Sequence, residues 1–234
     1  MIRFRYLFQF KDGSKKEFVV SLDEETLDLI NPQREKPPEW TRLGFHQCPN
    51  CPLSEVRSPY CPVALNLSDL IQSFKDCLSF EEAEIRIETA ERGYFKQASL
   101  QKGISSLMGI YMVTSGCPVL GSLKPMVRFH LPFASLEETQ YRVLSMYLLS
   151  QFIQYRNKKE PDWDLKGLEK IYDEIEIVNK AFSERLTSVL EQDAVANAVA
   201  ILNVFAQSIS FALDKNAFKK IEKIFSLEQK SKKV

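Results

Sequence analysis

The first ten residues alternate between hydrophobic and polar side chains, a period of two that is typical of a half-buried β-strand. Lys-Asp-Gly at residues 11–13 then predicts a hairpin turn, and the apolar run at residues 17–22 predicts the returning strand. The hydrophobic positions of the first strand share one face: Ile2, Phe4, Tyr6, Phe8 and Phe10.

The pattern changes after this hairpin. Ser21 and Glu24 fit a capping box, which predicts a short helix to about residue 30, and a proline-rich connector follows at residues 31–40. An amphipathic pattern at residues 66–78 predicts a longer helix. Alternation then returns in two further predicted strands, residues 83–90 and 94–99.

From about residue 100, apolar residues recur every three to four positions, which indicates helices. The first helix is predicted at residues 101–115, and Gly116 stands where it would stop. Because glycine weakens a helix, we expect close packing against Gly103 and Gly109. A loop with one short strand is expected at residues 119–135. Further helices are predicted at residues 136–156, 164–190, 193–213 and 215–228.

These elements predict an α+β fold, in which N-terminal antiparallel strands and a cysteine-bearing loop pack on a mainly helical C-terminal half. Residues 1–134 would form the α+β, metal-binding part and residues 135–234 the helical part. No flexible linker separates them, so we expect one continuous globular unit. The most apolar helix, residues 193–213, carries Asn and Gln side chains that are costly in lipid, so we predict a buried central helix and no membrane span.

Charge and composition narrow the range of partners. The chain has 234 residues, and 31 Lys and Arg residues balance 31 Asp and Glu residues. A balanced chain gives no general reason to expect nucleic acid or an anionic membrane as partner. Charged residues interrupt the N-terminal segment, which is unlike a secretory signal. We therefore expect a cytoplasmic protein, in which disulfides are disfavoured and clustered thiols indicate metal binding or catalysis.

The five cysteines are unevenly distributed along the chain. Cys48, Cys51 and Cys61 lie within fourteen residues, whereas Cys77 and Cys117 follow later. The two-residue gap between Cys48 and Cys51 lets both sulfurs reach one metal ion. Cys117 would complete such a site through the fold.

Proline separates four of these cysteines from the fifth. Each of the four is followed by proline, whereas Cys77 is followed by leucine. Proline fixes its own φ and favours extended geometry in the residue before it, so a thiol there has fewer conformations to lose when metal binds. We therefore predict that Cys77 is a small buried side chain. The predicted metal ligands are Cys48, Cys51, Cys61 and Cys117.

The two histidines are possible alternates to these ligands. His46 lies two residues before Cys48, and His130 lies in the apolar sequence RFHLPF. Either could replace a cysteine or hydrogen-bond to one. The neighbours of His130 favour a hydrogen-bonded core histidine instead.

Two kinds of metal centre fit four cysteines. The sequence CPNC resembles the knuckle of zinc ribbons, which favours zinc. Cysteine followed by proline also recurs at cluster-binding loops, so a [4Fe–4S] cluster is the alternative, and a group of thiols without metal is the third possibility. A thioredoxin-like dithiol fits poorly, because Pro52 and a third cysteine follow the pair.

The sequence defines a function only in outline. It contains no nucleotide-binding, metalloprotease or nucleophile-elbow motif. We expect a non-enzymatic protein whose zinc has a structural or regulatory role and whose helical half binds a protein partner or forms a homodimer. The alternatives are an iron–sulfur redox or sensor protein and, with less support, a metal-dependent enzyme that uses His130 beside Arg128 and Glu138.

Four segments resemble a bacterial family of unknown function, and together they span about residues 45–155. They are CPNCPL, YCPVALN, SLQKGISSLMGIYMVTSGCP and MVRFHLPFASLEETQYR. The resemblance implies a bacterial origin and no particular activity. It marks as residues of interest Cys48, Cys51, Cys61, Cys117 and His130.

Overall fold

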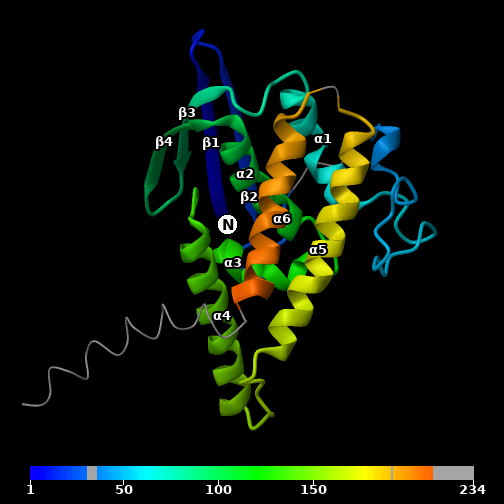
Figure 1. Ribbon diagram of the computed structural model, residues 1–234, viewed down its shortest axis with the longest axis vertical. Helices are drawn as coiled ribbons and strands as arrows, with labels where there is room; N and C mark the ends of the chain where they lie inside the picture. The colour runs from blue at the N-terminus through cyan, green and yellow to red at the C-terminus, as the bar shows by residue number, and fades with distance from the viewer. Residues whose placement is uncertain (31–35, 191, 213–234) are drawn as a thin grey trace, which may run out of the picture.

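The computed structural model describes residues 1–30, 36–190 and 192–212. An antiparallel sheet is packed on helices (Figure 1), which confirms the predicted α+β fold. The strands are β1 (Ile2–Phe10), β2 (Lys15–Leu22), β3 (Glu82–Glu88) and β4 (Gly93–Ser99). The α-helices are α1 (Pro62–Phe74), α2 (Leu100–Thr114), α3 (Lys124–Arg128), α4 (Leu136–Arg156), α5 (Lys166–Thr187) and α6 (Ala194–Ala212). Two 3-10 turns are η1 (Glu39–Thr41) and η2 (Leu120–Leu123).

The sheet has the strand order β2-β1-β3-β4, and every neighbouring pair is antiparallel. Both predicted strand pairs, β1 with β2 and β3 with β4, are confirmed. The predicted alternation of β1 is confirmed as well: Phe4, Tyr6 and Phe8 are buried. On the other face of the strand, Arg5 Nε lies 2.8 Å from the Glu17 carboxylate. One face of the sheet therefore carries the core, and the other carries exposed ion pairs.

Helices α1 and α2 pack on the buried face of the sheet (Figure 1). Phe74 of α1 meets Phe8 of β1 edge to face, with ring centroids 5.0 Å apart. Helix α6, orange in Figure 1, lies between α2 and α5. Ala198 and Val199 of α6 are fully buried, which confirms the predicted buried central helix. Among the helices that the structure describes, none combines the length and the apolar character needed to cross a bilayer.

Two alanine substitutions in α2 are expected to have opposite effects. Close packing is confirmed at Gly103, where an added Cβ would lie 2.7 Å from Phe8 Cε1 and closer still to Ile85. Gly103→Ala should therefore destabilise the fold by about 1–3 kcal/mol. Close packing is wrong for Gly109, where the nearest atom would be Leu202 Cδ2 at 3.7 Å. Gly109→Ala should stabilise by up to about 1 kcal/mol, because glycine is costly inside a helix. Urea unfolding measures both free energies, and shifts of the same sign would contradict this packing.

Two of the predicted local structures are wrong. The short helix after β2 is replaced by a turn, in which the Asp23 carboxylate accepts hydrogen bonds from the backbone N–H groups of Glu25 and Thr26. Ser21 cannot act as a helix cap there, because its backbone is paired with Arg3 in the sheet. The strand expected within residues 119–135 is also wrong, since this stretch forms η2 and α3.

Within the described residues the other helix predictions are confirmed, most of them with shifted ends. Helix α1 begins at Pro62, earlier than predicted, because proline fits the first helical position and Cys61 takes the N-cap. It ends at Phe74, so Cys77 lies in the turn that follows the helix. The predicted helix at residues 215–228 and part of the connector at residues 31–40 lie outside the described residues. The predicted division at residue 134 stays a prediction.

Candidate functional site

The fold brings together the four cysteines that precede proline. The thiols of Cys61, Cys117 and Cys51 lie close enough to Cys48 for their charges to act on it. Burial, and then these neighbouring thiols, raise the pKa of Cys48 to about 12. All five cysteines of the chain are free thiols. Cys77 is not among the groups that act on Cys48; its sulfur lies 3.7 Å from Lys16 Nζ instead.

The four sulfurs do not converge on a single point. In residues 1–30, 36–190 and 192–212, no group of three or more His, Cys, Asp or Glu side chains has an arrangement that could hold a metal ion. The grouping of the cysteines is thus a property of the fold, whereas metal binding by them stays a prediction.

Cys48 and Cys51 form the two ends of a tight turn. The backbone N–H of Cys51 donates to the carbonyl oxygen of Cys48 at 3.0 Å. Between them, the side-chain amide of Asn50 donates to the backbone carbonyl of Glu174 in α5 at 3.0 Å and also to its carboxylate. The turn is therefore held against α5, and this contact fixes the backbone positions of Cys48 and Cys51.

Cys61 is the N-cap residue of α1. Its backbone N–H donates to Thr41 at 2.8 Å, and its carbonyl accepts from Leu65 at 2.9 Å. The N-terminus of a helix carries partial positive charge. Proline at position 62 thus begins the helix and places this cysteine at its positive end.

Cys117 lies just beyond α2, where Gly116 turns the chain with a φ of +92°. Burial raises the pKa of Cys117, and the backbone N–H groups of Leu120 and Val119, which point at its sulfur, act in the opposite direction. Backbone donors of this kind stabilise a thiolate. Burial outweighs these donors and raises the pKa of Cys117 overall, so its free side chain is a neutral thiol whose sulfur two backbone N–H groups already contact.

Arg185 of α5 lies beside these cysteines, and the sequence analysis did not identify it. Its side chain is only 2% exposed. The guanidinium donates four hydrogen bonds of 2.7–3.3 Å to backbone carbonyls in the segment that precedes the cysteine turn. The acceptors belong to Trp40, Arg42, Leu43 and His46. One side chain therefore holds this whole segment against α5.

The charge of Arg185 has no carboxylate partner among the described residues. Burial lowers its pKa, and the thiols of Cys61, Cys48 and Cys51 are the groups that oppose this effect. A signal in the sequence was available, because residue 185 falls on the apolar stripe of α5, three positions after buried Phe182. A charged residue on such a stripe indicates a buried polar contact.

The two histidines lie apart from the cysteine group. His46 is exposed, and its ring meets Phe45 edge to face at 4.9 Å. His130 Nε2 is 2.7 Å from the Tyr6 hydroxyl and 3.3 Å from that of Ser106. Burial, followed by the charge of Arg142, lowers the pKa of His130 to about 3, so its ring is neutral at physiological pH. No described contact joins either ring to a cysteine.

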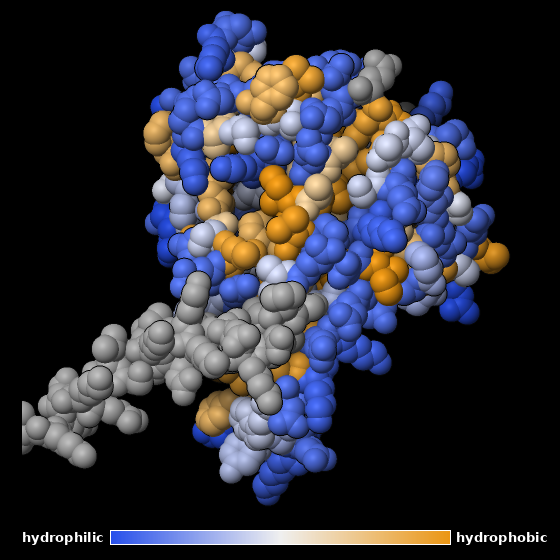
Figure 2. All heavy atoms as spheres, in the orientation of Figure 1, coloured by the Kyte–Doolittle hydropathy of each residue, from blue (hydrophilic) through white to orange (hydrophobic). Residues whose placement is uncertain are grey.

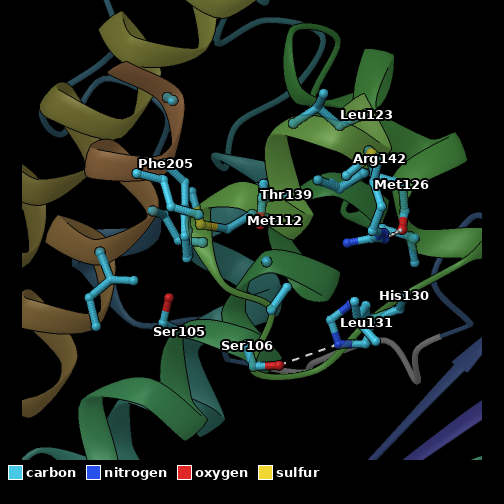
Figure 3. Close-up of a pocket in the computed structure, with 18 of the residues that line it drawn as sticks. Ser105, Ser106, Met112, Leu123, Met126, His130, Leu131, Thr139, Arg142 and Phe205 are labelled. Atoms are coloured by element: carbon cyan, nitrogen blue, oxygen red, sulfur yellow. Dashed lines mark hydrogen bonds between the residues drawn. The ribbon is translucent and has the colours of Figure 1, made fainter. Parts of the chain in front are cut away.

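The arrangement expected for a metal-dependent enzyme does not form around His130. The Glu138 carboxylate accepts a hydrogen bond from the backbone N–H of Ser135 at 2.7 Å, which completes the predicted capping box of α4. Arg128 is exposed and does not line the cavity that His130 faces. The cation beside His130 is Arg142 of α4 instead (Figure 3).

This cavity has a volume of about 510 Å³ and is bounded by α2 to α6. Figure 2, which has the orientation of Figure 1, shows a hollow rimmed by hydrophobic side chains on the face toward the viewer. In Figure 3, Met112 and Phe205 lie across the cavity from His130 and Arg142. Sequence reasoning did not find this cavity, because its walls come from helices that are far apart in the sequence.

Comparison with known proteins identifies a family for most of the chain. Residues 3–226 match a family described as "Domain of unknown function (DUF6901)". This confirms the resemblance to a family of unknown function, while the bacterial origin stays a prediction. No curated protein and no solved structure matches the chain.

Proposed function

The chain belongs to the family "Domain of unknown function (DUF6901)", and we propose that it is a metal-binding protein with a four-cysteine zinc centre. The metal has a structural or regulatory role. It joins the cysteine turn and the start of α1 to the loop after α2. The ligands are Cys48, Cys51, Cys61 and Cys117.

The observation that carries this proposal is the buried charge of Arg185 beside the cysteines. A buried guanidinium is costly unless negative charge lies close to it. Among the described residues no carboxylate supplies that charge, and the neighbours that can ionise are Cys48, Cys51 and Cys61. Four thiolates around one divalent ion retain a net negative charge, which matches the cation that α5 places there.

Two local features place partial positive charge near the sulfurs. Cys61 stands at the positive end of α1, and backbone N–H groups point at the sulfur of Cys117. An iron–sulfur cluster would use the same features, because its cysteine ligands are thiolates as well. Zinc remains the primary assignment on the spacing of Cys48 and Cys51, and the cluster is the alternative. Either centre needs reduced thiols, which accords with a cytoplasmic location.

The helical half offers a surface for a protein partner or a second copy of the chain. In Figure 1 the C-terminal part of α4 extends away from the sheet. Its apolar side chains are about half exposed, and clustered apolar groups of this kind mark interaction sites. They are Leu149, Phe152, Ile153 and Tyr155.

Metal analysis of the purified full chain tests the proposal directly. We expect a colourless protein with about one zinc ion per chain after expression in zinc-containing medium under reducing conditions. Expression in iron-rich medium without oxygen is the matched control: a brown protein that absorbs near about 400 nm would assign the cluster instead. A folded protein that holds neither zinc nor iron would refute the proposal.

A further inference from the structure

The cavity bounded by α2 to α6 has an apolar wall opposite a polar end (Figure 3). This wall consists of flexible aliphatic side chains and one aromatic ring, and no tryptophan lines it. Methionine and leucine adapt their shape to a flexible apolar ligand. Met112 and Phe205 lie on this wall; the cavity is also lined by Leu202 and, on the side of Arg142, by Leu123 and Met126.

The polar end contains a guanidinium with unused hydrogen-bond donors. Arg142 Nη2 donates to the carbonyl oxygens of Met126 at 2.9 Å and Phe129 at 2.6 Å. Its Nε and Nη1 atoms donate no hydrogen bond to any residue of the described ranges, and no carboxylate there forms an ion pair with it. The Arg142 side chain is half-buried, and this burial lowers its pKa. An anion in the cavity would gain hydrogen bonds and charge compensation together.

His130 faces the same end of the cavity with one ring nitrogen unused. Its Nε2 is engaged by Tyr6 and Ser106, whereas Nδ1 has no partner within the described part of the chain. If the Tyr6 hydroxyl donates to Nε2, the neutral ring carries its proton on Nδ1, which is then a hydrogen-bond donor. Arg142 and His130 come from different segments and line the same side of the cavity.

The other charged residues that line the cavity are positive, like Arg142. Lys96 and Lys102 also line the cavity, and Lys96 Nζ lies 5.7 Å from the centre of the Phe133 ring. No aspartate or glutamate is among the described residues that line it. A cavity that is apolar on one side and cationic on the other is complementary to an amphiphilic anion.

We propose that this cavity binds a fatty acid, with the carboxylate between Arg142 and His130 and the acyl chain along the apolar wall. The volume supports this assignment. At about 510 Å³ it lies within the range of about 300–1,000 Å³ that is typical of small-molecule sites. The cavity is separate from the cysteine group, so this inference does not depend on the metal.

Displacement of a fluorescent fatty acid from the full chain tests the proposal. We expect myristate to displace the probe from a single site. We expect 1-tetradecanol, which has the same chain without the charge, to bind about tenfold more weakly or worse, because it loses the charge-assisted hydrogen bonds. Tetradecyl phosphate is the third competitor. If it binds more tightly than myristate, the carboxylate assignment is wrong.

Two arginine variants form a matched pair. Arg142→Gln should weaken myristate binding about tenfold or more, whereas Arg128→Gln, at an exposed arginine outside the cavity, should leave it unchanged. Unaltered affinity in a folded Arg142→Gln protein would overturn the proposal. If Arg142→Gln does not fold, Leu123→Trp fills the cavity from a half-buried position and should abolish binding. Failure of myristate to displace the probe from the wild-type chain would also overturn it.

Discussion

Replacing Cys117 with serine is expected to lower the metal content and the melting temperature together. Cys117 lies more than fifty residues after Cys61, so a metal bound to both closes a long loop. Closing such a loop removes conformational freedom from the unfolded chain, and metal binding adds to the free energy of folding. We expect Cys117→Ser to cost about 3–5 kcal/mol, which corresponds to a decrease of roughly 10 °C for a chain of this size. Metal analysis and thermal unfolding of the same preparation measure both effects.

Cys77→Ser is the matched control, because it makes the same chemical change outside the cysteine group. Cys77 is half-buried and contacts Lys16 rather than the other cysteines. The serine should leave the metal content unchanged and cost about 1 kcal/mol, the modest penalty of a polar group in place of a thiol. Loss of metal with Cys77→Ser and retention with Cys117→Ser would show that proline after cysteine does not mark the ligands.

The sequence predicted those parts of the fold that depend on local periodicity. The alternation in β1 and the helical stripe of α5 each repeat over many residues, so single exceptions do not hide them. The capping box at Ser21 failed for a physical reason. Its residue types suit a helix start, but pairing with Arg3 holds Ser21 in β2, and Asp23 satisfies the next amides in a turn. Tertiary pairing therefore overrode a local signal.

The candidate sites could be predicted only where the residue types and their neighbours in the sequence indicate a function. Proline after each of four cysteines identified a group that the fold does bring together. Nothing local marks Arg185 as a partner of Trp40, because the two are 145 positions apart. The cavity was hidden for the same reason: Arg142 and His130 acquire a shared role only through packing of α4 against the loop after α3.

Replacing Arg185 with methionine is expected to destabilise the fold by about 3–5 kcal/mol. Methionine fills much of the space of the arginine stem, but it leaves unpaired the four carbonyl groups that the guanidinium satisfies. Arg156→Met is the control, since Arg156 is exposed at the end of α4 and should change stability by less than about 0.5 kcal/mol. Urea unfolding compares both variants with the wild type. Equal effects would contradict the role of Arg185 as a buried clamp.

Arg185 could act only as a clamp, or it could also compensate the charge of the metal centre, and the two roles predict different results. If it only holds the segment before the cysteine turn, Arg185→Met should cost the same free energy in the wild type and in Cys117→Ser. If it also compensates the negative metal–thiolate centre, removing it should cost less once the centre is lost, because the buried cation is then itself unpaired. We expect this second result, with a coupling of about 1–3 kcal/mol in a double-mutant cycle.

Arg185→Lys keeps the charge but loses the planar fork of the guanidinium. The lysine variant should therefore retain zinc against a chelator better than Arg185→Met, while recovering only part of the lost stability. Equal zinc retention by the lysine and methionine variants would leave Arg185 a structural clamp and remove the main support for the zinc centre.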